Sequence, residues 1–440
     1  MDFLNGRIRP IYFKYLGAAF GSALITSIYS IVDMAMVGQY HGPDGTAALA
    51  VVAPVWNIIY SLGLLMGTGG SVIFSTLKGR GTKTENENEY FTTALIGSVI
   101  LAVLSWAAVL KWEESLLLFF GADERLLPLA QEYLLPIKCT LPLFLFTQFL
   151  AGFLRNDQNP ELATAGVLSG GVFNVIGDYV FVFVLDMGIF GAGLATAIGS
   201  CISVVVMLTH FRSKKNTLTL VKPSEPLKKL KEICITGFST FFIDIAMGFL
   251  TILFNRQIMK CLGADALSVY GPIVNVSTFV QCCAYSVGQA SQPIISINYG
   301  AKKGGRIRET LSYALKTAAV FGVFWTVLSL TAPNLYIRIF MEPTEHILEI
   351  APAIIRHYSI SFLLLPFNIF STSYFQVLLK PKTAFVVSVS RGLVVSGALI
   401  LALPSLLGAD SLWFAMPITE LITALYAGRM MAKYTKELPA

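Results

Sequence analysis

Residues 46–77 read TAALAVVAPVWNIIYSLGLLMGTGGSVIFSTL and contain no Asp, Glu, Lys or Arg. A helix needs about 20 predominantly apolar residues to cross the hydrocarbon core of a bilayer, which is about 30 Å thick. Residues 266–301 form a second run without a charged side chain. Neither run shows the period-two alternation of a membrane β-strand, and helices satisfy their own backbone groups in lipid. Both runs therefore predict transmembrane helices.

The rest of the chain has the same apolar character. Of its 440 residues, 55% are hydrophobic and 13% are charged, whereas soluble domains carry about 25% charged residues. The composition therefore predicts an all-α polytopic membrane protein with twelve transmembrane helices and the lipid bilayer as its solvent. We expect these helices near residues 12–38, 46–76, 91–119, 128–153, 160–185, 189–211, 231–260, 264–299, 306–332, 346–378, 383–403 and 409–432.

Basic residues are concentrated in alternate connections, and most densely between Arg212 and Lys231. The other set of connections holds only Lys111, Arg125, Lys260 and Arg338. Cytoplasmic loops carry the excess of Lys and Arg, so this pattern predicts an even number of spans with both termini in the cytoplasm. We expect the protein in the plasma (inner) membrane. The net charge of +6 is then a consequence of topology and indicates no nucleic-acid partner.

The two halves of the chain resemble each other. LAVVAPVWN at residues 49–57 aligns with LSVYGPIVN at residues 267–275, and later matches keep a nearly constant offset. Parallel six-helix repeats are common in transporters, which handle substrate between the halves. We therefore expect two pseudo-symmetric six-helix lobes, an N-terminal lobe (residues 1–212) and a C-terminal lobe (residues 231–440), joined by a cytoplasmic linker (residues 213–230).

Four polar residues are expected at similar depth in the outer half of the N-terminal lobe: Asp33, Asn174, Asp178 and Thr196. Asn174 and Asp178 are four residues apart and so share one helix face. Ionisable groups inside a membrane are costly and mark functional sites. Carboxylate, amide and hydroxyl oxygens suit either of two roles. They can chelate a hard cation such as Na⁺, or the two carboxylates can share a proton.

Four further residues are candidates for contact with substrate: Asp244, Gln289, Gln292 and Glu420. Asp244 and Glu420 lie near the middle of their predicted helices, where an acid facing a central cavity would attract a cationic substrate. Glu420 could instead pair locally. Gln292 is followed by Pro293, a combination that also indicates a structural kink.

Several segments together resemble the multidrug and toxic compound extrusion (MATE) transporters. The segments are YSIVDMAMVG at residues 29–38, RNDQNP at 155–160, GIFGAGLA at 188–195 and QP with NYGA within 292–301. The resemblance covers essentially the whole chain. It implies twelve helices in two lobes around a V-shaped cavity, antiport of organic cations against Na⁺ or H⁺, and a cation site on the residues that match Asp33, Asn174, Asp178 and Thr196.

We therefore expect a monomeric secondary active exporter of small organic cations that uses Na⁺ or H⁺ and no cofactor. The alternative is a flippase for lipid-linked sugar or oligosaccharide precursors, which would favour a basic cavity. No GxxxxGK[ST] motif is present to bind ATP, and no HExxH or GxSxG motif indicates an enzyme.

Overall fold

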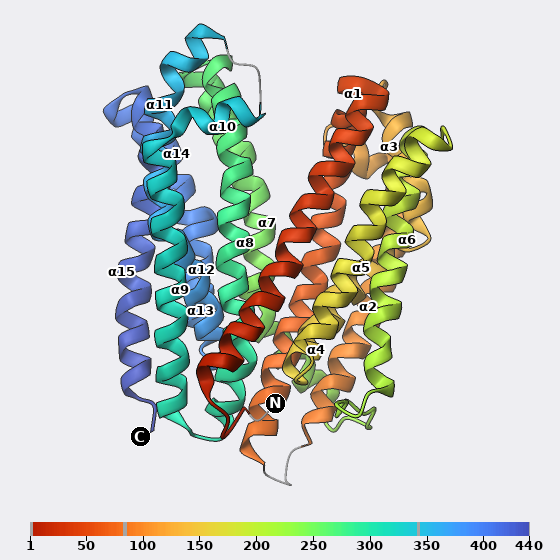
Figure 1. Cartoon of the computed structure of the whole chain (residues 1–440), viewed down its shortest axis with the longest axis vertical. Coiled ribbons are helices and arrows are strands. Elements are labelled where there is room, and N and C mark those ends of the chain that lie inside the picture. Colours follow the sequence, from red (N-terminus) through yellow and green to blue (C-terminus); the bar gives the residue numbers. More distant parts are fainter. Residues whose placement is uncertain (1–2, 82–85, 341–343, 440) are drawn as a thin grey trace. The chain divides into compact units, whose positions relative to one another are not determined.

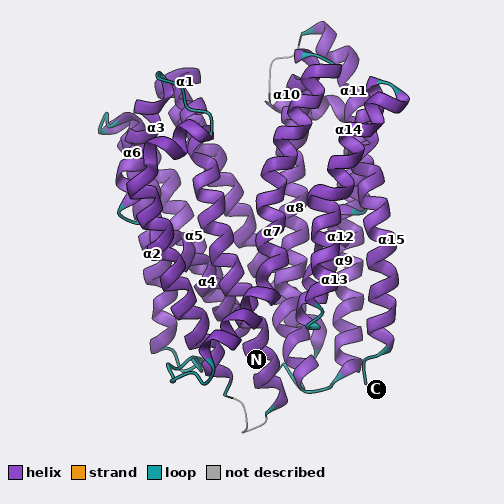
Figure 2. Ribbon diagram, turned by 180° about the vertical axis from the view of Figure 1, so that it is seen from behind, coloured by secondary structure: helices purple, strands orange, loops and turns teal. Residues whose placement is uncertain are grey.

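All regular secondary structure in the described residues is helical (Figures 1 and 2). The structure is a computed structural model of the chain, and it describes residues 3–81, 86–340 and 344–439. The chain divides into two compact units. The first unit is Gly17–Phe241, and the second combines Met1–Leu16 with Phe242–Ala440. The lobes expected at residues 1–212 and 231–440, with a linker at 213–230, stay a prediction.

The first unit contains most of α1 and the helices up to the start of α7. Its elements are α1 (Ile8–Arg80), α2 (Glu87–Phe119), α3 (Leu126–Lys138), α4 (Leu141–Asn156), α5 (Pro160–Asp178), the π-helical turn η1 (Tyr179–Val184), α6 (Gly188–Leu208) and the 3₁₀ turn η2 (Thr209–Arg212). α1 holds two successive spans, Ile8–Gly42 and Asp44–Arg80. They meet at Gly42, whose φ of 65° is readily adopted only by glycine.

The second unit contains the remaining helices and the first residues of α1. Its elements are α7 (Pro226–Cys261), α8 (Ala264–Gly300), α9 (Gly304–Thr331), α10 (Pro333–Phe340), α11 (Glu345–Ser359), η3 (Ile360–Leu363), α12 (Leu365–Val377), α13 (Pro381–Val389), η4 (Ser390–Val394), α14 (Val395–Leu407), η5 (Ala409–Phe414) and α15 (Ala415–Lys436). The start of α1 belongs here because the ring of Tyr12 stacks on Tyr313 with a centroid distance of 6.0 Å.

Ten helices in the described residues are long and apolar enough to cross a membrane, or eleven if α3 and α4 form one bent span. The single span expected at 128–153 is thus two helices that meet at 58°. Thr140 leaves the helical conformation, and Pro142 follows in the first turn of α4, where its missing N–H restarts a helix at little cost. The last expected span, 409–432, corresponds to η5 and α15, which are not among the ten or eleven.

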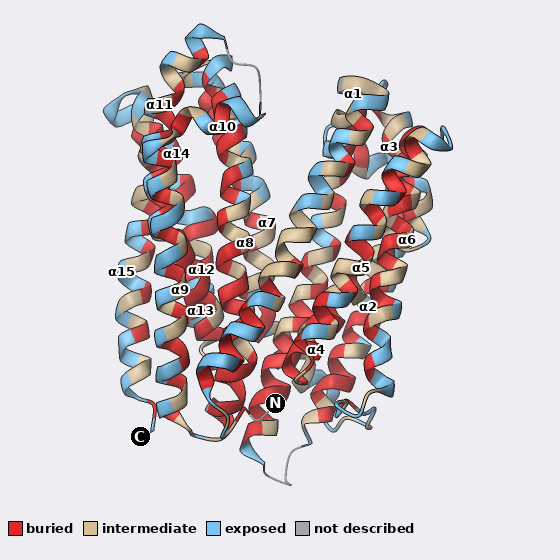
Figure 3. Ribbon diagram, viewed as in Figure 1, coloured by how far each residue is buried: buried red, intermediate tan, exposed pale blue. Residues whose placement is uncertain are grey.

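Many residues along these helices are exposed (Figure 3), and large apolar residues are among them. On α2, Val99, Val103 and Leu104 are 46%, 53% and 61% exposed. On α9, Val320 and Phe324 are also exposed. Large contiguous apolar surfaces indicate contact with a membrane or partner, and helices of this length can present them to lipid.

A buried carboxylate holds the polar connection between α6 and α7 in the first unit. Asp157 is fully buried, and its carboxylate accepts hydrogen bonds from Lys78 Nζ at 2.8 Å, from the backbone N–H of Thr217 at 2.8 Å and from the Thr217 hydroxyl. Nε2 of His210 lies 2.8 Å from Asp157 Oδ2, the oxygen that also accepts from the Thr217 N–H. Burial alone would raise the pKa of Asp157, but these hydrogen bonds lower it below its ordinary value.

Asp157→Asn should lower the free energy of unfolding by about 2 kcal/mol at pH 7, because it removes the charge to which Lys78 hydrogen-bonds. The folded-state pKa of Asp157 lies below its ordinary value of 3.8, so its stabilisation is present above that value and is lost as the pH falls through the folded pKa. Melting temperatures of the purified variants at pH 7 and at about pH 2, well below the ordinary pKa of the carboxyl group, test this.

The difference between wild type and Asp157→Asn should shrink at the lower pH. Glu225→Gln is the matched control, since Glu225 is exposed and pairs with the exposed Lys228 nearby on the chain. That variant should melt with the wild type at both pH values. An equal loss for Asp157→Asn at both pH values would contradict a role for the charge.

Candidate ion-coupling site

The centre of the candidate site is a hydrogen bond between α1 and α3. The hydroxyl of Tyr133 donates to Asp33 Oδ2 at 2.7 Å, and both residues are buried. Tyr133 also interacts with the Thr196 hydroxyl and, through space, with the carboxylate of Asp178. Tyr133 therefore connects residues from α1, α5 and α6 of the first unit.

α5 and α6 supply the other three residues expected at this site. Asn174 Nδ2 donates to Thr196 Oγ1 at 2.9 Å. Asp178 is the last residue of α5 and is fully buried, one turn beyond Asn174. The helix continues as the π-helical turn η1, a feature that is frequent at functional sites. The carboxylates of Asp33 and Asp178 are close enough to interact electrostatically.

Four acceptor oxygens of this cluster are buried and have no hydrogen-bond donor among the described residues. They are Asp33 Oδ1, Asn174 Oδ1, Asp178 Oδ1 and Asp178 Oδ2. Buried polar atoms in proteins are almost always paired, and a buried carboxylate without a partner is costly. A bound cation or bound protons would satisfy these oxygens. These residues therefore fit either of the two roles predicted from the sequence, which are binding a cation such as Na⁺ and binding a proton.

A small cavity borders the cluster within the first unit. Its volume is about 60 Å³, and Asn174 and Thr196 line it together with polar residues of α1, α4 and α6. Those residues are Thr26, Tyr29, Tyr60, Thr147, Gln148, Ser200 and Ser203. A buried water needs roughly 10–15 Å³ of such volume and polar partners. The cavity can therefore hold a few water molecules next to Asn174 and Thr196.

Close packing of α3 on α6 positions Tyr133. Gly193 has no side chain, and a Cβ atom there would come within 2.1 Å of the backbone oxygen of Tyr133 and 3.0 Å of Pro136. Backbone atoms cannot move aside as a flexible side chain can. A larger residue at this position would push α3 away from α6 and lengthen the hydrogen bond from Tyr133 to Asp33.

Gly193→Ala should destabilise the protein by about 1–3 kcal/mol, the usual cost of overpacking. Gly17→Ala is the matched control. A Cβ atom at Gly17 would meet nothing within 4 Å, so that change should be neutral or stabilising because alanine favours the helix. Melting temperatures of the two purified variants measure the difference. Equal melting temperatures would contradict the tight α3–α6 contact.

The four candidate substrate contacts lie in the second unit. They do not form a cluster of buried acids like the one around Asp33. Asp244 on α7 and Gln289 and Gln292 on α8 are half-buried. Glu420 on α15 is fully buried, and its Oε1 accepts a hydrogen bond from Arg391 Nε at 2.7 Å. Glu420 Oε2 accepts a second one from Asn368 at 2.6 Å. In the structure Glu420 therefore pairs locally, which is the alternative that the sequence analysis left open for this residue.

Tyr133 is the residue that sequence analysis missed at the candidate site. It is one of 17 tyrosines, and its chemistry alone did not distinguish it. A usable signal was its place near the outer end of the span expected at 128–153, at the depth expected for Asp33. Within the described residues no group of three or more His, Cys, Asp or Glu could hold a metal ion, so any bound cation would depend on the amide and hydroxyl oxygens as well.

Comparisons with known proteins agree with this architecture. A sequence profile of the MatE family matches residues 18–180 and 238–399. Two staphylococcal relatives are both named multidrug export protein MepA. The protein from Staphylococcus aureus strain MSSA476 is 23% identical over 407 residues, which is 92% of this chain and 89% of the relative. The protein from Staphylococcus saprophyticus is 24% identical over 410 residues, with the same coverage.

Solved structures share the fold at low sequence identity. One is described as the outward-facing conformation of a multidrug resistance MATE family transporter of the MOP superfamily. It has a TM-score of 0.90 and 20% identity, and the match covers 99% of this chain and 98% of that one. Another, a MOP superfamily transporter from Pyrococcus furiosus described as having a binding pocket of reverse polarity, has a TM-score of 0.89 and 20% identity with the same coverage. This likeness shows a common multi-pass helical fold.

Proposed function

Because the chain belongs to the MatE family, we propose that it is a secondary active antiporter that exports small organic cations in exchange for Na⁺ or H⁺. It would act in the plasma (inner) membrane as a monomer, with both termini in the cytoplasm. The names of the relatives, which are multidrug export proteins, support export. The observation that carries the proposal is the set of buried, unpartnered acceptor oxygens on Asp33, Asn174 and Asp178.

The coupling ion would bind at Asp33, Asn174, Asp178 and Thr196. Na⁺ would take oxygen ligands from these side chains, whereas H⁺ would bind to the carboxylates themselves. In either case the ion neutralises a buried negative charge, and the free energy of that step depends on how well each arrangement of the protein excludes water. Coupling requires that ion and substrate bind the inward-open and outward-open states with different affinities.

Tyr133 would support the ion-free form of the site. Its hydroxyl donates to Asp33 Oδ2, and a hydrogen bond to a charged acceptor contributes about 1.5–3 kcal/mol. That bond leaves Asp33 Oδ1 directed elsewhere and without a donor among the described residues. Asp33 can therefore keep its link to α3 while its second oxygen takes or releases the ion.

Two basic side chains in or near the predicted spans are already paired with carboxylates. A pyrophosphate-linked precursor calls for cationic side chains that are free to pair with phosphate. Lys138 lies 2.7 Å from Glu113, and Arg391 lies 2.7 Å from the buried Glu420. These ion pairs favour the export of organic cations over the movement of anionic lipid precursors.

Transport by purified protein in liposomes tests the proposal. Liposomes would be loaded with a fluorescent organic cation, and a Na⁺ gradient or a pH gradient would be imposed separately with the membrane potential held at zero. Gradient-driven movement of the cation by the wild type would support antiport, and the effective gradient would identify the ion. Folded protein that moves the cation under neither gradient would contradict the proposal. Movement of a fluorescent lipid-linked pyrophosphate instead would favour the flippase.

A further inference from the structure

A larger cavity lies in the second unit, far along the chain from the candidate coupling residues. Its volume is about 500 Å³, within the range of sites that bind small molecules. The turn between α7 and α8 with the first residues of α8, one face of α11 along most of its length, and η5 supply its lining. In Figure 1 these segments lie at the end of the second unit opposite the C-terminus.

The floor of this cavity is apolar and firmly packed. Trp413, Ala266 and Ile354 line the cavity and are 1%, 4% and 7% exposed. The indole of Trp413 packs against the rings of Phe254 and Tyr270, with centroid distances of 6.1 Å and 6.3 Å. An apolar surface that is rigid before binding loses little conformational entropy when a ligand arrives. These side chains form the closed base of the cavity, and the half-buried Leu262 and Ile350 provide the apolar surface that a bound ring can contact.

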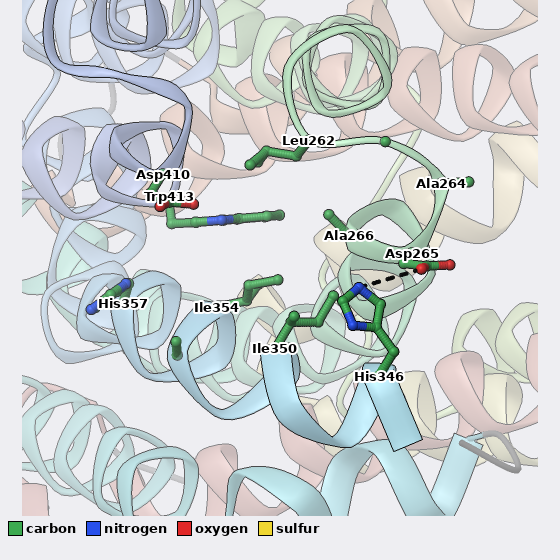
Figure 4. Close-up of a pocket in the computed structure, with 12 residues that line it drawn as sticks. Leu262, Ala264, Asp265, Ala266, His346, Ile350, Ile354, His357, Asp410 and Trp413 are labelled. Carbon is green, nitrogen blue, oxygen red and sulfur yellow. Dashed lines mark ion pairs between the residues drawn. The ribbon is translucent and has the colours of Figure 1, made fainter. Parts of the chain in front are cut away.

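The rim of the cavity is acidic. Figure 4 shows the carboxyl groups of Asp265 and Asp410 on opposite sides of the apolar side chains of Ile350 and Ile354. His346 Nε2 lies 3.6 Å from Asp265 Oδ2, and this histidine is charged only when protonated. None of the described lining residues is Lys or Arg. An anionic ligand would find no permanently positive partner among these residues, because the two lining histidines are charged only when protonated.

We propose that this cavity binds amphiphilic organic cations. An aromatic or aliphatic body would lie against Leu262 and Ile350. Its cationic groups would lie beside Asp265 and Asp410. A carboxylate at each end of an apolar surface matches a ligand with two separated positive charges. The described side chains give no group of three ligands that could share a metal ion, so the organic cation is the better match.

This site is independent of the proposed coupling site. Asp33 and Asp178 belong to the first unit, whereas every residue that lines the cavity belongs to the second. Binding at the cavity should therefore persist in a variant that cannot couple an ion. The inference goes beyond the proposed export function, because it requires neither a gradient nor movement of the ligand.

Equilibrium binding to the full-length protein in lipid nanodiscs tests the proposal. Ethidium and propidium share one aromatic ring system, and propidium carries a second positive charge on a side chain. Asp265→Asn and Asp410→Asn should each weaken propidium binding about threefold, and the double variant about tenfold, since exposed ion pairs contribute at most about 1 kcal/mol each. Ethidium, with one charge, should be affected less by the double variant.

Two further variants act as a matched control and a steric test. Glu349→Gln removes a carboxylate that is 82% exposed and lies within 4.0 Å of His346 without lining the cavity, so propidium affinity should not change. Ala353→Trp places a large side chain at the exposed edge of the cavity and should weaken both dyes at least tenfold. Melting temperatures would establish that each variant is folded.

Two results would overturn the inference. Wild-type affinity in both the double variant and Ala353→Trp would show that the dyes bind elsewhere. Loss of propidium binding in Asp33→Asn, with no loss in Asp265→Asn or Asp410→Asn, would place the dye at the coupling site.

Discussion

Asp33→Asn should abolish gradient-driven export, with a fall of at least tenfold in the rate of cation movement in proteoliposomes. Asparagine has nearly the size of aspartate, and its side-chain oxygen can accept the hydrogen bond that Tyr133 donates to Asp33. The contact between α1 and α3 should therefore survive. What is lost is the negative charge, without which the site can bind neither Na⁺ nor H⁺ with useful affinity.

The size of this effect follows from what coupling requires. Coupling free energies between two ligands are typically 1–3 kcal/mol, which is about 5- to 150-fold in affinity. A variant that no longer binds the ion loses the whole coupling free energy. The substrate then crosses the membrane only at the rate that does not depend on the ion gradient. Asp178→Asn should show the same loss, because Asp178 provides the other buried carboxylate of the cluster.

Glu114→Gln is the matched control for these two variants. Glu114 is an exposed carboxylate on α2, so removing its charge should leave transport unchanged. Melting temperatures of all three variants should stay close to that of the wild type. If folded Asp33→Asn exported the cation at the wild-type rate and kept its gradient dependence, the proposed coupling site would be wrong.

The membrane-spanning fold could be predicted from the sequence because long uncharged runs have few alternatives to transmembrane helices. The grouping of Asp33, Asn174, Asp178 and Thr196 could also be anticipated, since helix direction and rise place residues at a given depth. The depth of a residue in the membrane follows from its position along its own helix. These predictions therefore needed no knowledge of which helices are neighbours.

Contacts that depend on neighbouring helices could not be predicted in the same way. Tyr133 reaches Asp33 across 100 positions of sequence, and Arg391 reaches Glu420 across 29. Glu420 was identified as an acid within a predicted span, but nothing in a single sequence indicated that Arg391 is its partner. The break between α3 and α4 was missed for another reason. Apolar residues lie on both sides of Lys138 and Thr140, so the two segments could be taken for one span, and Pro142 marks the new helix start.

Glu420→Gln should destabilise the protein by about 3–5 kcal/mol, the usual cost of removing one partner from a buried ion pair. The side chains of Arg391 and Glu420 are 1% and 0% exposed. Arg391 Nη1 and Nη2 have no acceptor among the described residues, so the carboxylate of Glu420 is the only anion that the described contacts give this guanidinium. A glutamine would also direct an N–H₂ group toward Asn368 Nδ2 or Arg391 Nε, which are both donors.

A double variant separates the loss of the pair from the loss of either charge. In Arg391→Met with Glu420→Leu, no buried charge remains uncompensated, and apolar replacements of similar volume are often neutral or stabilising. The double variant should therefore have a higher melting temperature than Glu420→Gln. If the two side chains acted independently, their destabilising effects would add and the double variant would melt at a lower temperature. Melting temperatures of the purified proteins in detergent measure this order.

The same variants decide whether Glu420 contacts substrate. A structural pair predicts that Glu420→Gln lowers the melting temperature by several degrees, and that the protein which remains folded binds organic cations with unchanged affinity. A substrate contact predicts the reverse, with a normal melting temperature and weaker binding of the cation. Because both oxygens of Glu420 already accept hydrogen bonds from Arg391 and Asn368, a substrate cation would have to compete with a buried guanidinium for the same charge. That competition is unfavourable unless Arg391 moves away, so we expect the first of these two results.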